Sequence, residues 1–253
     1  MNPNCQFPNE RISVVARAQE SGTTATFTSA LAAFDQNWNE TYGIFSKGMN
    51  SDTYEPYRWR PGSITHFGPK NEDVSSLILS IPYTLGYMSA GDLQQGMSVA
   101  ALSNRLGQFV TVTTESLQLI PIQAAMDAQR NSDSLTVDLV NPDTPGSYPI
   151  SSYTYFVMYG TKMQDCSKAT ELMRYILWFM TDQQALEAAD NGFATLNEKI
   201  VSRVRSEVLS HVQCKGRLVL DLVEDQIAEE NKTENTWIIP VAVTCGYYGV
   251  VTA

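Results

Sequence analysis

The sequence has few of the residues that enzymes most often use for acid–base chemistry or for binding zinc. It contains two histidines and four cysteines, and neither set has the spacing of a zinc site. We interpret His66 and His211 as surface or satisfied residues. No G-x-S-x-G sequence is present to expose a serine nucleophile. We therefore expect a protein that is not an enzyme and that uses neither a metal nor another cofactor.

Positive charge is also scarce. Lys and Arg number 17 against 27 Asp and Glu, which gives a net charge of −10. Binding to nucleic acid needs a cationic surface, so we expect no nucleic-acid partner. A small anion remains compatible with this composition, because a few donors aimed at one point can outweigh the net charge. Hydrophobic residues make up 43% of the chain, which predicts a packed core and excludes global disorder.

The two ends of the chain lack complete targeting or membrane segments. Residues 1–11 contain no apolar core of a signal peptide. Residues 237–253 (WIIPVAVTCGYYGVVTA) carry no charge, yet they are shorter than the roughly 20 residues of a membrane-spanning helix. Two interpretations stay open for them: the start of a transmembrane helix, or a buried terminal strand. We expect an internal fragment of a longer protein on the extracellular or periplasmic side, anchored in a membrane through this apolar tail.

This interpretation divides the chain into three parts. Residues 1–220 are expected to form the folded domain, residues 221–236 an acidic linker, and residues 237–253 the apolar tail. Two sequons agree with an extracellular compartment, although such triplets are common by chance. They begin at Asn39 and Asn231, which are candidate glycosylation sites.

The hydrophobic pattern alternates between strands and helices, which indicates an α/β fold. Ile12–Arg17 is a short apolar run that predicts a buried strand. Phe27, Leu31 and Phe34 then share one helix face, and Ser21 or Thr23 can cap the helix that carries them. Further predicted elements are a helix over Val74–Leu79, strands over Leu85–Met88 and Gln108–Val112, a helix over Thr114–Ala128, and a buried strand over Ser152–Tyr159.

Two more helices are predicted in the last third of the domain. Ser167 can cap the first of them, and Asn191-Gly192 would end it. Thr195 and Glu198 form a T-x-x-E capping box for the second helix. The apolar faces comprise Leu172, Met173, Ile176, Leu177 and Met180 in the first helix, and Leu196, Ile200, Val204 and Val208 in the second.

The sequence R-x-x-x-S-G-T-T, from Arg17 to Thr24, is the most suggestive pattern for function. It places an arginine at the end of a strand, immediately before a helix whose first amides have no intrahelical partner. Those amides, the helix dipole and nearby hydroxyl groups favour an anion, which the guanidinium can bind in a bidentate manner. Gly22 lets the backbone approach a ligand closely. The same spacing is also compatible with ordinary helix capping.

The segment VVARAQESGTTATFTSALAAFDQNW resembles the signature region of the phosphate-binding proteins of high-affinity phosphate ABC transporters. IPYTLGYMS and YPISSYTYFVMYG resemble later strands of that family, and the helical stretch from Ala169 to Val212, with Trp178, resembles its closing helices. The resemblance implies a type II periplasmic-binding-protein fold, with one lobe complete plus the closing helices of the other. The family's opening lobe segment, with its proton-accepting aspartate, should lie upstream of Met1.

By this resemblance, Arg17, Ser21, Gly22 and Thr23 hold phosphate. The chain departs from the family at two positions beside them. Gln19 stands where the family usually has Asp, which removes a carboxylate expected to orient the arginine. Glu20 stands where the family usually has Gly and places a negative charge next to the anion unless it points to solvent.

The sequence thus supports two main hypotheses. The first is non-enzymatic binding of phosphate or a similar oxyanion, and the alternative is an adhesion or scaffold ectodomain whose ligand site has been lost. A hydrolase with Ser21 as nucleophile is a third, weaker reading, because no base is evident. Cys166 and Cys214 bracket the helices that resemble the family's closing helices, so they form either a disulfide or two buried thiols.

Overall fold

The computed structural model describes residues 6–119, 137–189 and 192–234. The chain divides into two units, and each is described by itself. The first unit comprises Met1–Phe156 and Met180–Val201, and the second comprises Val157–Phe179 and Ser202–Ala253.

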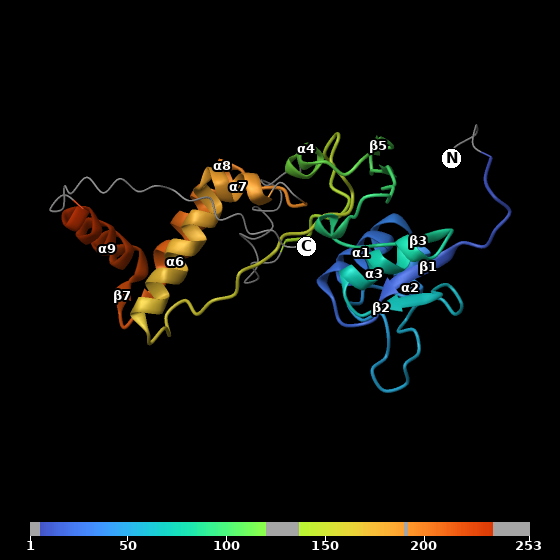
Figure 1. Ribbon diagram of the computed structural model, residues 1–253, viewed down its shortest axis with the longest axis horizontal. Helices are drawn as coiled ribbons and strands as arrows, with labels where there is room; N and C mark the ends of the chain where they lie inside the picture. Colours follow the sequence, from blue (N-terminus) through green and yellow to red (C-terminus); the bar gives the residue numbers. More distant parts are fainter. Residues whose placement is uncertain (1–5, 120–136, 190–191, 235–253) are drawn as a thin grey trace, which may run out of the picture. The chain divides into compact units, whose positions relative to one another are not determined.

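A parallel three-stranded sheet forms the centre of the first unit (Figure 1). Its strands are β1 (Ser13–Arg17), β2 (His66–Gly68) and β3 (Thr84–Gly86), in the order β2-β1-β3. Val15 pairs with His66 on one side and with Gly86 on the other. The prediction for β1 is therefore confirmed, whereas β3 begins and ends earlier than predicted. His66 lies in β2, a strand that the sequence pattern did not predict.

Three helices surround this sheet: α1 (Gly22–Phe34), α2 (Gln36–Thr41) and α3 (Asn71–Ser80). The predicted helix after β1 and the predicted helix over Val74–Leu79 are confirmed as α1 and α3. The chain runs from β1 through α1 to β2, and then from β2 through α3 across to β3. In the order β2-β1-β3, the connection from β1 to β2 and the connection from β2 to β3 move in opposite directions across the sheet. Because parallel crossovers are right-handed, α1 and α3 lie on opposite faces of the sheet.

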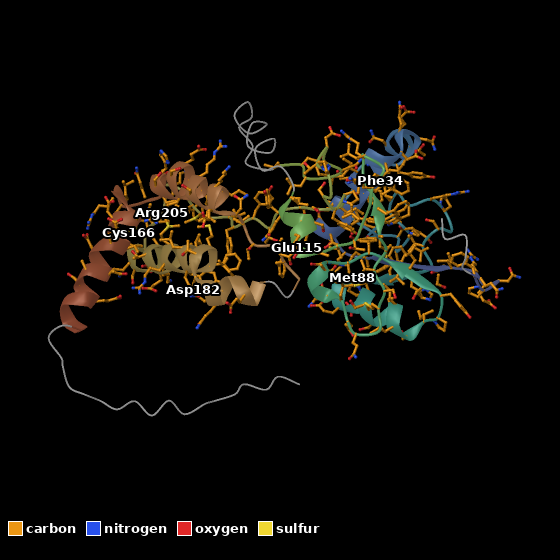
Figure 2. The ribbon with its side chains drawn as sticks, turned by 90° about the horizontal axis from the view of Figure 1, so that it is seen from above. Phe34, Met88, Glu115, Cys166, Asp182 and Arg205 are labelled. Carbon is orange, nitrogen blue, oxygen red and sulfur yellow. A yellow bond between two sulfur atoms is a disulfide. The ribbon has the colours of Figure 1, made fainter. Side chains whose placement is uncertain are left out.

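An aromatic core covers the α1 side of β1. Val15 and Ala16 are both fully buried, and they face opposite sides of the sheet because side chains alternate along a strand. Ala16 packs in a cluster with Phe45 and Trp59. The half-buried residues around this cluster are Phe27, Leu31, Trp38, Tyr42, Tyr57, Ile64, Phe67 and Tyr87. Phe34, labelled in Figure 2, is 42% exposed, so Phe27 and Leu31 bury most of the predicted helix face.

Short elements complete the first unit. These are η1 (Ala90–Asp92), the hairpin of β4 (Leu102–Ser103) and β5 (Phe109–Val110), α4 (Thr114–Gln118) and α7 (Gln183–Ala189), with α8 (Glu198–Arg203) spanning the boundary between the units. The strand predicted over Gln108–Val112 corresponds to β5. The helix predicted over Thr114–Ala128 is present through Gln118, and residues 120–128 lie outside the described residues.

The segment Ser152–Tyr159 corrects the prediction of a buried strand. It has no regular secondary structure, and no strand of the described residues pairs with it. Val157 is 95% exposed and Tyr159 is 72% exposed. A strand needs a neighbouring strand to satisfy its backbone, and the apolar pattern by itself could not show whether one is available.

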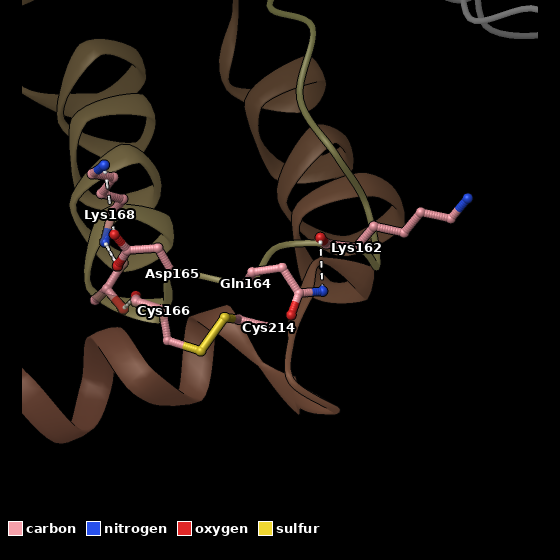
Figure 3. Close-up of a disulfide and its surroundings, with 7 residues drawn as sticks. Lys162, Gln164, Asp165, Cys166, Lys168 and Cys214 are labelled. Atoms are coloured by element: carbon pink, nitrogen blue, oxygen red, sulfur yellow. Dashed lines mark hydrogen bonds and ion pairs between the residues drawn. A yellow bond between two sulfur atoms is a disulfide. The ribbon is translucent and has the colours of Figure 1, made fainter.

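The second unit consists mainly of α6 (Cys166–Thr181), which runs across the boundary, and α9 (Val219–Glu234). Between them lie η2 (Val204–Val208), η3 (Leu209–His211) and the hairpin of β6 (Gln213–Cys214) and β7 (Arg217–Leu218). Its buried apolar residues are Ala169, Met173, Ile176, Leu209, Val212, Cys214, Val219 and Val223. The Cys166–Cys214 disulfide is present, with an S–S distance of 2.04 Å (Figure 3). The disulfide prediction is thus confirmed.

The caps of α6 and α8 differ from those predicted. Asp165, not Ser167, caps α6, because its Oδ1 accepts a hydrogen bond from the backbone nitrogen of Lys168 at 3.1 Å (Figure 3). Asp182 separates α6 from α7 by accepting from the amides of residues 184 and 185, so α6 ends well before Asn191. Asn197 rather than Thr195 caps α8, since its Oδ1 accepts from the backbone nitrogen of Ile200.

The acidic stretch expected as a solvated linker is helical from Val219 to Glu234. Val223 on this helix is buried, and the carboxylate of Glu230 binds Arg174 of α6 through two hydrogen bonds of 2.6 and 3.3 Å. No helix within the described ranges is long and apolar enough to cross a membrane. The apolar tail, residues 237–253, lies outside those ranges.

Candidate functional site

The loop between β1 and α1 leads into the first turn of α1, where some backbone N–H groups make no hydrogen bond with the described residues. Ser21 caps α1, since its Oγ accepts a hydrogen bond from the backbone nitrogen of Thr23 at 3.1 Å. The amides of Gly22 and Thr24 donate to none of the described residues. Gly22 is exposed, and a Cβ atom there would have no neighbour within 4 Å. Thr24 is fully buried, so the first turn of α1 offers one free N–H group beside open space, that of Gly22, at the positive end of the helix dipole.

The segment Ser46–Met49 supports this loop from behind. The backbone nitrogen of Ser21 donates to the carbonyl of Ser46 at 2.9 Å, and that of Met49 donates to the carbonyl of Ala18 at 3.0 Å. The hydroxyl of Ser46 donates to Oε1 of Glu20 at 3.1 Å. Glu20 is exposed and is held on the Ser46 side of the loop. The side chain of Gln19 is exposed and makes no hydrogen bond with any described residue.

Arg17 is held by neutral acceptors. Its Nε donates to the carbonyl of Pro69 at 3.1 Å, and its Nη1 donates to Oδ1 of Asn71 at 2.6 Å. Arg17 forms no ion pair with any carboxylate of the described residues, and its Nη2 donates to none of them. The guanidinium is therefore fixed in place while its charge and part of its donor set remain available to an anion.

Tyr87 connects the end of β1 to the start of α1. Its hydroxyl accepts a hydrogen bond from the backbone nitrogen of Arg17 at 3.2 Å and pairs with Oγ1 of Thr24 at 2.9 Å. Its ring stacks on Phe27, with ring centroids 4.3 Å apart. Burial raises the pKa of Tyr87 above its ordinary value, and the hydrogen bonds with Thr24 and the Arg17 amide offset part of that rise. At neutral pH Tyr87 is thus an uncharged clamp between the two elements.

The sheet topology brings two helix N-termini to the same edge. The loop after β1 leads to α1, and the loop after the adjacent strand β2 leads to α3 on the opposite face. Adjacent parallel strands whose connections diverge in this way mark the usual ligand position of open α/β sheets. The Arg17 side chain extends from the end of β1 to the β2–α3 loop, which lies at this position.

The four residues predicted to hold phosphate thus lie on one loop and one helix turn: Arg17, Ser21, Gly22 and Thr23. Sequence reasoning missed Asn71, Tyr87 and the Ser46–Met49 segment. Asn71 and Tyr87 are 54 and 70 residues from Arg17, so no local pattern could have connected them.

Other candidate residues are placed as follows. Asn39 is exposed on α2, and the side chain of Asn231 lies outside the described residues. His66 contacts Thr65 and His211 contacts Ser210, each its neighbour in sequence. No cluster of metal-ligating residues occurs in the part of the chain that the structure describes.

The comparisons with known proteins agree on one family. The family profile described as "PBP superfamily domain" matches residues 4–183. The chain is 29% identical to the phosphate-binding protein PstS of Methanocaldococcus jannaschii over 204 residues, which are 77% of this chain and 50% of the relative. It is 25% identical to PstS of Pasteurella multocida over 215 residues, which are 84% of this chain and 57% of the relative. It is 29% identical to PstS3 of Mycobacterium bovis over 216 residues, which are 82% of this chain and 53% of the relative. The chain spans about half the length of these relatives.

Proposed function

The chain belongs to the PBP superfamily, and on this basis we propose that it binds phosphate or a similar oxyanion and catalyses no reaction. Its relatives carry the name of phosphate-binding proteins. The observation that carries the proposal is the state of Arg17, which is held by two neutral oxygens and by no carboxylate of the described residues. A guanidinium already paired with a carboxylate has little attraction left for an anion, whereas this one retains it.

In this proposal the ligand lies at the start of α1. Arg17 supplies the positive charge, and the exposed amide of Gly22 supplies a hydrogen bond at the positive end of the helix dipole. The hydroxyl groups of Ser21 and Thr23 add further donors. Gly22 allows the ligand to approach the backbone, because nothing fills the space beside its Cα.

We place the domain on the extracellular or periplasmic side of a membrane, with anchoring through residues 237–253 as part of the same proposal. The Cys166–Cys214 disulfide supports this location, because disulfides persist in oxidising compartments and are rare in the cytosol.

Calorimetric titration of the whole chain with inorganic phosphate tests the proposal. Arg17→Ala should abolish binding while the circular dichroism spectrum stays unchanged. Arg11→Ala is the matched control, since Arg11 is exposed and, among the residues that the structure describes, donates only to the carbonyl of Gly62, at 3.5 Å. Sulfate should bind with similar affinity, because no carboxylate of the described residues bonds to the loop amides or to Arg17 to select a protonated ligand. A wild-type chain without heat of binding, or an Arg17→Ala chain that binds normally, would contradict the proposal.

Gln19 and Glu20 favour the alternative, an adhesion or scaffold domain without a small ligand. Gln19 makes no hydrogen bond to Arg17, and Glu20 keeps a carboxylate on the loop. On this alternative the wild type binds no phosphate, and the double change Gln19→Asp with Glu20→Gly creates binding. A wild type that binds as tightly as the double variant would exclude it.

A further inference from the structure

Asn71 presents its amide oxygen to Arg17 for a chemical reason. A guanidinium only donates hydrogen bonds, so the group facing Nη1 at 2.6 Å must be an acceptor. Oδ1 of Asn71 fills this role, and its Nδ2 must then face the opposite way. An amide that turned over would direct an N–H group at the guanidinium and lose the bond. The position of Arg17 therefore depends on what holds the other end of the Asn71 amide.

Asp92 holds that end. Nδ2 of Asn71 donates to Oδ2 of Asp92 at 2.8 Å, and both residues are at least partly buried. A carboxylate only accepts hydrogen bonds, so it can pair with Nδ2 but not with Oδ1. Arg17 thus donates to Asn71 and Asn71 donates to Asp92, and the Asn71 amide can make both bonds in one orientation only.

Asp92 is itself fixed by the same helix that carries Asn71. The hydroxyl of Ser75, one turn further along α3, donates to the backbone carbonyl of Asp92 at 2.6 Å. The backbone nitrogen of Asp92 donates to the carbonyl of Ser89 at 3.0 Å within η1. Ser75 is fully buried, so this attachment is protected from solvent. The backbone of Asp92 is thus held in place by contacts that do not involve the charge of the carboxylate.

We propose that Asp92 is a positioning residue, which fixes the Asn71 amide so that Asn71 holds Arg17 in its anion-binding orientation. This arrangement supplies the orienting carboxylate that position 19 lacks. Because the neutral amide stands between them, the carboxylate orients the guanidinium without pairing with it directly. The inference rests on the proposed function. Asn71 and Asp92 both lie outside the loop from Arg17 to Thr24 that the sequence pattern indicated.

The proposal makes a prediction whose sign differs from that of simple electrostatics. Removing a carboxylate near an anion site should strengthen anion binding by Coulomb's law. We expect Asp92→Ala to weaken phosphate binding about tenfold instead. This is the effect expected from losing one hydrogen bond to a charged group, here the bond from Asn71 to the carboxylate. Asp92→Asn keeps an acceptor for Nδ2 and removes the charge, so it should bind phosphate at least as tightly as the wild type.

Two further variants complete the experiment, which is calorimetric titration of the whole chain with inorganic phosphate. Glu72→Ala is the matched control, because Glu72 is an exposed carboxylate on the first turn of α3 whose side chain forms no hydrogen bond or ion pair with Asn71 or Arg17. It should bind as tightly as the wild type or slightly more tightly. In an Asn71→Ala background, Asp92→Ala should have no further effect, since Asp92 acts through Asn71.

The outcomes separate the inference from the proposed function. If the wild type binds phosphate but Asp92→Ala binds as tightly or more tightly, the Asp92 inference is wrong and the proposed function stands. If Asp92→Ala and Asp92→Asn weaken binding equally, the charge rather than the positioning matters, which also overturns it. If the wild type binds no phosphate, both the proposed function and the inference fail. Should Asp92→Ala fail to fold, Asp92→Leu takes its place in both backgrounds, because leucine has nearly the shape of aspartate and no acceptor for Nδ2. Weaker phosphate binding in Asp92→Leu than in Asp92→Asn supports the inference, and equal binding overturns it.

Discussion

Gly48 packs directly against the main chain of Arg17, so that a Cβ atom at position 48 would overlap with the carbonyl oxygen of Arg17. The contact lies behind the β1–α1 loop, where Met49 and Ser46 also bond to it. The geometry of the candidate anion site thus depends on a glycine outside the loop itself.

Gly48→Ala should therefore destabilise the fold by about 1–3 kcal/mol, because backbone atoms must move to admit the methyl group. It should also weaken phosphate binding, since the displaced backbone belongs to the loop that carries the site. Urea unfolding and calorimetric titration measure the two effects. A Gly48→Ala chain with wild-type stability would show that the loop can shift freely.

Gly22→Ala should have the reverse pattern. Nothing lies within 4 Å of a Cβ atom at position 22, and alanine is a better helix residue than glycine, so stability should stay the same or rise by up to about 1 kcal/mol. Phosphate affinity should fall several-fold, because the methyl group occupies space next to the first amides of α1. Unchanged affinity in this variant would place the ligand elsewhere.

Tyr87→Phe should cost about 1–2 kcal/mol of stability, because the Arg17 amide and the Thr24 hydroxyl lose their shared partner. The pKa of Tyr87 is raised by burial, so its contribution is present below the unfolded pKa of about 10 and is lost as the pH rises through the folded pKa. The wild type should therefore lose more stability above about pH 10 than Tyr87→Phe does. Urea unfolding at neutral and alkaline pH tests this, with Tyr54→Phe as control, since Tyr54 is 77% exposed.

Reduction of the Cys166–Cys214 disulfide should destabilise the second unit. The two cysteines are 48 residues apart, and closing a loop of that length corresponds to about 4 kcal/mol in the chain-entropy treatment. Thermal unfolding with and without a reducing agent measures the loss. The double variant Cys166→Ser with Cys214→Ser should have the melting temperature of the reduced wild type, both with and without the reducing agent. Equal melting of the oxidised and reduced wild type would contradict the expectation.

Asp165 should make the stability of α6 sensitive to acid. The backbone hydrogen bond from Lys168, with the charge of its ammonium group, lowers the pKa of the Asp165 carboxyl. A lowered pKa means that the stabilisation is present above the unfolded value of about 3.9 and is lost as the pH falls through the folded value. Asp165→Asn keeps the cap without this titration. Between about pH 5 and about pH 3 the wild type should lose more stability than Asp165→Asn, and equal losses would show that the carboxylate is not the group responsible.

The parts of this protein that could be predicted from sequence are those with local causes. The apolar run of β1, the spacing of Phe27 and Leu31 and the hydroxyl of Ser21 all act within a few residues, and each produces the expected element. The pairing of Cys166 with Cys214 was also anticipated, through the resemblance to a family and the position of the cysteines around its helices.

Predictions that depended on a distant partner were less successful. Ser152–Tyr159 has the composition of a buried strand, but no described strand pairs with it, and most of its apolar side chains are exposed. The acidic stretch after Val219 looked like a linker because its charges dominate its composition. It is a helix because Val223 is buried and Glu230 binds Arg174.

The candidate site shows the same division. The sequence by itself determined that an arginine would precede a capped helix start, because strand, turn and cap follow one another within eight residues, from Arg17 to Thr24. Only the tertiary structure decided how that arginine is held. Asn71 and Tyr87 bond to Arg17 at the end of β1, and Asp92 bonds to Asn71. The parallel order β2-β1-β3 brings these segments together, although Asn71 and Tyr87 are more than fifty residues from Arg17. Hydrogen bonds between such segments depend on which strands pair and on which face each helix lies, and neither is encoded in a local pattern.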